Sequence, residues 1–221
     1  MPSTSAREKE EDAAHRRRAR AWMRALGPYR TRRFELEPDR AALLVVDAQR
    51  YFLEAGSRGR VLWSAPVVRR LQALQEAFRA RGRPVVMTRH AHAPDGSDGG
   101  NLAWWWGGLL REGRRSSELL PALAPAPGEP VVHKTTYSAF LGTGLEAVLR
   151  GGSVRDLVVA GVLTDLCVET TAREAFCRGF RVKVVADACS TSDARLQLGA
   201  LRSMAHGFAD VCLAADVVEG L

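Results

Sequence analysis

Short apolar runs rich in valine alternate along the chain with longer segments in which apolar residues recur every three or four positions. The runs occupy 41–47, 84–88, 130–133, 155–161, 181–185 and 208–213. Continuous apolar runs of this length are typical of strands covered on both faces, and strands that alternate with helices form parallel sheets. The sequence therefore predicts an α/β fold, a single three-layer α/β/α domain around a mostly parallel, six-stranded, Rossmann-like sheet.

The segments between these runs carry helix start and stop signals. Helices are expected at 66–82, 142–151, 165–179 and 192–206, and each ends at or just before a glycine. Residues 6–26 are charged and helix-prone, so 1–33 is interpreted as a basic helical N-terminal extension and 34–221 as the domain proper. Residues 89–129 fit no regular pattern, and an irregular stretch of this length is usually a functional loop.

Charge is concentrated in the N-terminal extension. The net charge is +7, and residues 1–33 hold ten basic and four acidic side chains, so the rest of the chain is close to neutral. A nucleic-acid binder would carry basic residues on the folded domain itself, so we expect no nucleic-acid partner. No apolar run approaches the roughly 20 residues that span a membrane, so we expect no membrane partner either.

The four cysteines show no metal-finger spacing, and the N-terminus lacks the apolar core of a signal peptide. Reduced thiols in the cytoplasm are therefore expected. Cys177, Cys189 and Cys212 have apolar neighbours and are interpreted as small core residues.

Three reactive side chains lie at the ends of predicted strands. Asp47 closes the first strand, Lys134 follows the third, and Cys167 comes a few residues after the fourth, where a helix begins. The carboxyl ends of parallel strands meet at one edge of a sheet, where ligands bind in this fold class. A helix start favours the thiolate, so we expect the pKa of Cys167 to be lowered.

Four sequence blocks carry a family resemblance: LLVVDAQRYF (43–52), VVMTRHAH (85–92), HKTTYSAFLGTGLEAVLR (133–150) and the segment 157–188 around TDLCVETTA. Together they resemble the isochorismatase-like cysteine hydrolases, which include isochorismatases, nicotinamidases and N-carbamoylsarcosine amidases. The resemblance covers residues 34–216. It implies a catalytic triad of Asp47, Lys134 and Cys167, and a homodimer or homotetramer.

The resemblance also implies a cis peptide bond between Val162 and Leu163. This bond would turn the N–H of Leu163 toward the site, where it would form an oxyanion hole with the N–H of Cys167.

Three reaction classes remain open. The cysteine within TDLCVETTA favours hydrolysis of a small-molecule amide, carbamoyl or lactam C–N bond through a thioester. The N-terminal extension resembles isochorismatase relatives, and the alternative is vinyl-ether hydrolysis with Asp47 as general acid. A carrier role without catalysis is the third class. A natural-product amide from secondary metabolism is one conceivable substrate.

Substrate contacts are expected mainly from aromatic residues, because an aromatic, weakly charged pocket suits a planar amide. The predicted contact residues are Phe52, Arg89, His90, Trp105, Tyr137 and Thr164. Nicotinamidases bind a metal through an Asp-x-His segment, but here His90 takes the aspartate position. We therefore expect no metal and no cofactor.

Overall fold

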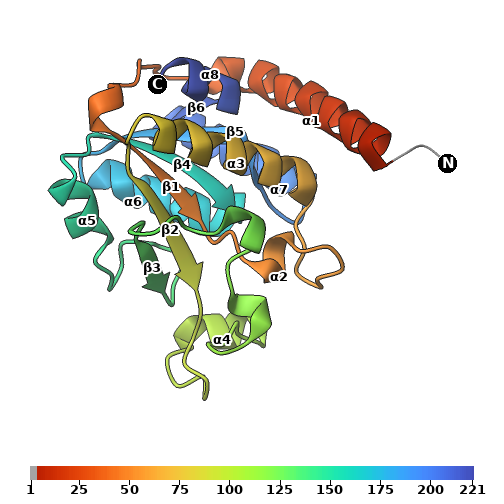
Figure 1. Ribbon diagram of the computed structural model, residues 1–221, viewed down its shortest axis with the longest axis vertical. Helices are drawn as coiled ribbons and strands as arrows, with labels where there is room; N and C mark the ends of the chain where they lie inside the picture. The colour runs from red at the N-terminus through yellow and green to blue at the C-terminus, as the bar shows by residue number, and fades with distance from the viewer. Residues whose placement is uncertain (1–3) are drawn as a thin grey trace.

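The computed structural model describes residues 4–221 and contains a six-stranded, all-parallel sheet. The strand order is β3-β2-β1-β4-β5-β6, which places β1 and β4 at the centre (Figure 1). The predicted three-layer α/β fold is therefore confirmed. The strands are β1 (Ala41–Val46), β2 (Val85–His90), β3 (Val131–Lys134), β4 (Asp156–Val162), β5 (Arg181–Ser190) and β6 (Asp210–Cys212).

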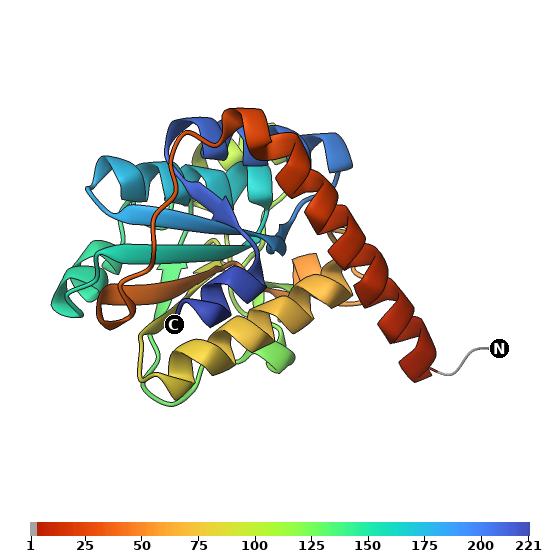
Figure 2. The ribbon, with the colours of Figure 1, turned by 90° about the horizontal axis from the view of Figure 1, so that it is seen from above.

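Helices cover both faces of this sheet. Figure 2 shows α3 (Ser64–Ala80) and α8 (Ala214–Glu219) on one side and α6 (Glu169–Cys177) and α7 (Ala194–Gly207) on the other. Asp193 caps α7, because its side chain accepts from the N–H groups of Arg195 and Leu196. The remaining helical elements are α2 (Arg50–Leu53), α4 (Gly100–Trp106), α5 (Leu145–Gly151), a π-helical turn η5 (Thr164–Val168), and short 3₁₀ turns at Gly27–Tyr29, Pro38–Arg40, Arg115–Ser117 and Pro121–Leu123. No helix of residues 4–221 is both long and apolar enough to cross a membrane.

The helix α1 (Thr4–Leu26) lies within the predicted N-terminal extension, whose first three residues are outside the described part of the chain. Its second half packs on the domain, where Trp22 and Leu26 join the main hydrophobic core. His15 is fully buried, and its Nε2 lies 2.9 Å from the carbonyl oxygen of Asp187 on β5. The first half projects beyond the other elements (Figure 2).

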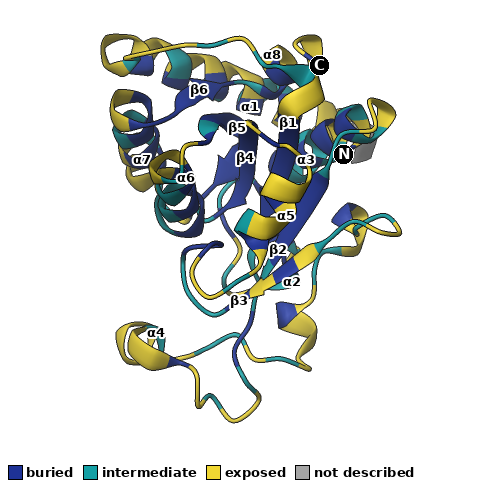
Figure 3. Cartoon of the chain, turned by 90° about the vertical axis from the view of Figure 1, so that its left-hand side faces the viewer, coloured by how far each residue is buried: buried dark blue, intermediate teal, exposed yellow. Residues whose placement is uncertain are grey.

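Burial follows the valine-rich pattern. All residues of β1 and β4 are buried, whereas the edge strand β3 alternates between exposed and buried positions (Figure 3). Within the loop 89–129 the helix α4 stands away from the sheet and carries the three tryptophans, which are all exposed.

Two sequence expectations need correction here. β5 does not end at residue 185 but continues to Ser190, because a register irregularity after Val159 lets β4 pair with it again at Cys189 and Ser190. Cys177 is not a core residue: it is the last residue of α6 and is exposed, whereas Cys189 and Cys212 are buried as predicted.

Candidate active site

The structure brings Asp47, Lys134 and Cys167 into direct contact at the carboxyl edge of the sheet. The Lys134 Nζ lies 2.8 Å from Asp47 Oδ2 and donates to Cys167 Sγ at 3.3 Å. Asp47 and the Lys134 side chain are fully buried, while 7% of Cys167 is exposed. The thiol is therefore the member of this cluster that a ligand can reach first.

Asp47 follows directly after β1 and is held by its neighbour on β2. Its φ of 48° lies in the left-handed region, which non-glycine residues rarely adopt and which aspartate tolerates better than most. The Thr88 hydroxyl donates to Asp47 Oδ1 at 2.6 Å and accepts from the Asp47 N–H at 3.0 Å. One carboxylate oxygen is thus fixed by Thr88, and the other faces Lys134.

Cys167 reaches the site because β4 approaches β1 very closely. Gly161 pairs with Val46, and a Cβ at Gly161 would lie 2.1 Å from the Val46 carbonyl oxygen, so no larger residue fits there. One residue further along, the peptide bond between Val162 and Leu163 is cis. Cys167 then lies in the π-helical turn that precedes α6 and not in the first turn of a regular α-helix.

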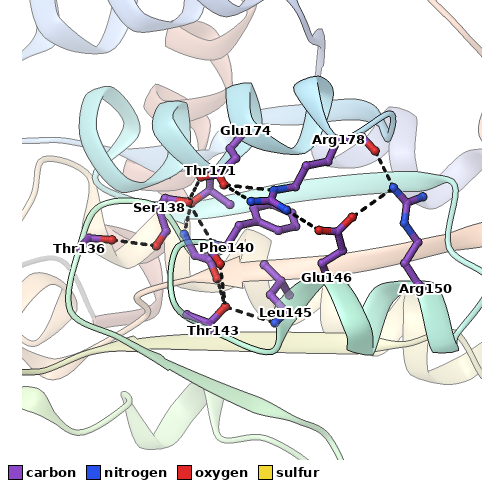
Figure 4. A network of polar contacts seen from close by, with 11 residues as sticks. Thr136, Ser138, Phe140, Thr143, Leu145, Glu146, Arg150, Thr171, Glu174 and Arg178 are labelled. Carbon is purple, nitrogen blue, oxygen red and sulfur yellow. Dashed lines mark hydrogen bonds and ion pairs between the residues drawn. The ribbon is translucent and has the colours of Figure 1, made fainter.

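A polar network ties the loop after Lys134 to α6, the helix that follows Cys167 (Figure 4). The Lys134 ammonium donates to the Thr136 carbonyl at 2.8 Å. Further along this loop, the Ser138 hydroxyl donates to Glu174 of α6, and the Ala139 N–H donates to Thr171 at 3.0 Å. The position of Lys134 relative to the thiol therefore depends on contacts between two segments far apart in sequence.

We expect Ser138→Ala to lower kcat about tenfold, equivalent to about 1.4 kcal/mol of barrier, because the loop that positions Lys134 loses its contact with Glu174. Steady-state kinetics on purified protein measure this effect. Ser203→Ala is the matched control, since Ser203 also donates to a glutamate of α6, Glu169, at 2.6 Å but does not contact the loop. Equal losses in the two variants would contradict the positioning role.

The Cys167 thiol is not activated at rest, contrary to the expectation from its place near a helix start. Burial raises its pKa to about 12; the Lys134 ammonium opposes this shift and the Asp47 carboxylate adds to it. A thiolate would put two negative charges beside one ammonium in a buried site, and burial penalises net charge. The resting site therefore holds a neutral thiol beside a Lys134–Asp47 ion pair. Burial opposes the charged form of Lys134, but its contacts with the Asp47 carboxylate and the Cys167 sulfur outweigh this effect, so its pKa is raised.

His90 and His92 lie beside this cluster. Their ring centroids are 4.9 Å apart, because residues two positions apart on an extended segment point to the same face. His92 Nδ1 lies 3.2 Å from Asp98. Within residues 4–221, no group of three or more His, Cys, Asp or Glu side chains is arranged to hold a metal ion.

His90 makes stability depend on pH. Burial, followed by the charge of Lys134, lowers its pKa from 6.5 to about 4. Below pH 6.5 the unfolded chain binds a proton that the folded protein does not take up until about pH 4. The free energy of unfolding is therefore expected to fall by about 3 kcal/mol over this interval on account of His90 alone.

Chemical denaturation of wild type and His90→Gln at pH 7 and pH 4.5 tests this expectation. The variant should lose less stability on acidification than wild type, while His206→Gln, at an exposed histidine, should behave as wild type. An identical loss in wild type and His90→Gln would contradict the burial of a neutral imidazole.

The remaining predicted substrate contacts lie in different surroundings. Tyr137 accepts a hydrogen bond from Trp106 Nε1 at 2.7 Å, which links α4 to the loop after Lys134. Trp105 is 66% exposed and contacts Trp104. Arg89 forms an ion pair with Glu112 at 2.9 Å, and Phe52 packs against the core.

Thr164 differs from the other predicted contacts because its side chain is fully buried. Its hydroxyl donates to Gln197 of α7 at 2.7 Å. This hydroxyl therefore connects the π-helical turn to α7.

Gln49 is a structural residue of this site that the sequence did not indicate. It is fully buried; its amide nitrogen donates to the carbonyls of His90 and Ser117, each at 2.8 Å, and its oxygen accepts from the His90 N–H at 2.9 Å. Its position after Asp47 in the DAQ segment was the available signal. Gln49 fixes the end of β2 beside the reactive cluster.

The parallel sheet thus carries a carboxylate, an ammonium and a thiol in contact at its carboxyl edge. The family model for the isochorismatase domain matches residues 41–216. The chain therefore belongs to the isochorismatase family, and it is a hydrolase.

Similar proteins agree with this assignment. Nicotinamidase 3 of Arabidopsis thaliana is 36% identical over 185 residues, which cover 82% of this chain and 88% of that protein. Ureidoacrylate amidohydrolase RutB of Methylorubrum extorquens is 32% identical over 200 residues, covering 80% and 81%. The crystal structure of a cysteine hydrolase from Pseudomonas syringae pv. phaseolicola matches with a TM-score of 0.81 at 32% identity, covering 85% of this chain and 95% of that one.

Proposed function

We propose that the protein hydrolyses a C–N bond of a small-molecule amide, carbamoyl compound or lactam through a thioester on Cys167. The observation that carries the proposal is the Lys134 ammonium, which contacts both Asp47 at 2.8 Å and the thiol at 3.3 Å. Moving the thiol proton to Asp47 leaves a thiolate beside the same ammonium. The buried site then holds one ion pair before and after the transfer, so activation adds no net charge.

Acylation follows from this transfer. Cys167 Sγ attacks the carbonyl carbon and Asp47 takes the thiol proton, while the N–H groups of Leu163 and Cys167 hold the oxyanion. Preorganised donors of this kind lower barriers by about 3–4 kcal/mol. In the tetrahedral intermediate the leaving nitrogen and Sγ are bonded to the same carbon, so the nitrogen also lies close to Asp47. Asp47 can therefore protonate the nitrogen as the C–N bond breaks.

Deacylation returns the enzyme to its resting state. Asp47 accepts a proton from water as the water oxygen attacks the thioester carbonyl. The second tetrahedral intermediate collapses with cleavage of the C–S bond. The thiolate, held by Lys134, then regains its proton from Asp47, and the acid product leaves.

The exposures of the three groups favour this chemistry over vinyl-ether hydrolysis. Vinyl-ether hydrolysis by a general acid needs no nucleophile, whereas here the Cys167 thiol is the member of the cluster that keeps exposed surface. The nicotinamidase and the ureidoacrylate amidohydrolase named above also act on C–N bonds by their names, which supports the amide class.

We further assign substrate contacts to Phe52, Arg89, His90, Trp105, Tyr137 and Thr164. The bond between Trp106 and Tyr137 supports an aromatic wall close to Lys134. His90 remains neutral at physiological pH because its pKa is lowered to about 4, so it suits an uncharged amide better than a dianion.

We also propose that the enzyme acts in the cytoplasm on a small molecule, without a nucleic-acid or membrane partner, as a homodimer or homotetramer. Four cysteines that form no disulfide suit a reducing compartment.

A substrate screen tests the proposed reaction. Nicotinamide, ureidoacrylate, N-carbamoylsarcosine and isochorismate are incubated with wild type and Cys167→Ala, and ammonia and vinyl-ether cleavage are both measured. Turnover of an amide or carbamoyl compound by wild type alone is expected. Cleavage of isochorismate that survives in Cys167→Ala would replace this function with the vinyl-ether reaction.

A further inference from the structure

A concave groove lies at the amino edge of the sheet, on the side opposite the reactive cluster. It has a volume of about 560 Å³ and opens between the segment 31–34, the start of β5 and the turn between α7 and β6. Pockets of roughly 300–1,000 Å³ accommodate small organic ligands. The catalytic side chains follow the carboxyl ends of β1, β3 and β4, so none of them lines this groove.

Aromatic side chains form its apolar walls. Phe34, Phe176, Phe180 and Phe208 all line the groove, and the rings of Phe176 and Phe208 lie 6.4 Å apart. Half of Phe176 is exposed, although it lies on a helix whose other face is buried. Phe176 therefore offers exposed apolar surface at the groove, whereas Phe180 and Phe208 are buried behind it.

The wall formed by the segment 31–34 is held in place by hydrogen bonds. Thr31 donates through its hydroxyl to the His206 carbonyl at 2.6 Å and through its N–H to the Ala205 carbonyl at 3.3 Å. The Phe34 N–H donates to Asp210 at 3.3 Å. The groove is thus preformed, which reduces the entropic cost of binding.

Most charges around the groove are already compensated. Asp210 is paired with both Lys183 and Arg30. Arg181 is paired with Asp156 at 2.6 Å and with Glu37 at 3.0 Å.

Arg32 and Arg33 differ from these residues. Both line the groove and are exposed, and within residues 4–221 neither forms a hydrogen bond or an ion pair. Two uncompensated guanidinium groups therefore lie beside an apolar cavity.

We propose that this groove binds an aromatic carboxylate, with its ring against the phenylalanine walls and its anionic group on Arg32 and Arg33. Guanidinium groups match carboxylates in geometry and charge, and aromatic rings pack favourably against one another. The site is separate from the catalytic centre and does not depend on the proposed reaction.

Calorimetric titration of the full chain with 2-naphthoate tests the assignment, with 2-naphthylmethanol as the neutral probe of the same ring system. We expect 2-naphthoate to bind more tightly. The double variant Arg32→Ala/Arg33→Ala should lower the affinity for 2-naphthoate by about tenfold or more. It should change the affinity for 2-naphthylmethanol by less than about twofold. Phe176→Ala should lower the affinity for both probes.

Two control variants locate the bound probe. Arg58→Ala removes an exposed arginine outside the groove, and Tyr137→Ala alters the surroundings of the catalytic cluster; both should leave the affinity for 2-naphthoate unchanged. Loss of binding in Tyr137→Ala with normal binding in the double arginine variant would place the probe at the catalytic centre and overturn the proposal.

Two other outcomes also overturn it. Equal affinity for the two probes would show that charge has no part in binding. The second outcome combines two results: 2-naphthoate does not bind, and sedimentation shows self-association that the double arginine variant abolishes. These results would assign the groove to a second copy of the chain.

Discussion

Cys167→Ala is expected to lower kcat by about 10⁴-fold or more on the amide substrate, because no other group of the site can form the thioester. The fold should persist. The substitution removes one sulfur from a side chain that is already 7% exposed and leaves the Lys134–Asp47 ion pair in place. Kinetics together with circular dichroism and thermal unfolding measure both parts of this expectation.

Cys189→Ala is the matched control for this variant. Cys189 is fully buried on β5, and burial likewise raises its pKa to about 12, but it does not contact Asp47 or Lys134. The Cys189→Ala variant should lose stability and retain turnover. Comparable loss of activity in both variants would mean that sulfur removal acts through packing, and covalent catalysis would lose its support.

A second large effect is expected for Lys134→Met, which should lower kcat/KM by about 10³-fold or more. Without the ammonium, proton transfer from the thiol to Asp47 would create an unpaired buried thiolate, which is strongly disfavoured. Asp47 also loses its ion-pair partner at 2.8 Å, which leaves its buried carboxylate without a compensating charge. The rate of Cys167 alkylation by iodoacetamide near pH 8 should fall in parallel with turnover.

Lys183→Met separates this chemical role from the general loss of a buried ion pair. Lys183 is also buried and is paired with a carboxylate, Asp210, at the opposite edge of the sheet. Both variants should lose stability, because removing one partner of a buried pair costs about 3–5 kcal/mol. Only Lys134→Met should lose activity; equal retention of activity in the two variants would exclude Lys134 from the mechanism.

The sequence predicted those features that local pattern determines. The valine-rich runs identified all six strands, and the ends of β1, β3 and β4 indicated where Asp47, Lys134 and Cys167 would meet. In a parallel sheet all strands run in the same direction, so their carboxyl ends lie at one edge. Residues at the ends of different strands can therefore be predicted to lie close together.

Features that depend on tertiary contacts were not predictable in this way. The pKa of Cys167 is controlled by burial and by two charges that are distant in sequence, so a rule based on a nearby helix start gave the wrong direction. The buried amide of Gln49 gains its role only once β2 and Ser117 lie beside it.

The most direct test of the account is to trap the acyl group on Cys167. Wild type is mixed with the amide found to be turned over, quenched in acid during the steady state and digested with trypsin. The peptide 156–173, whose only cysteine is Cys167, should gain the mass of the acyl group, and the corresponding peptide of Cys167→Ala should not. Full turnover with no such mass on the peptide, together with activity in Cys167→Ala, would contradict the thioester mechanism.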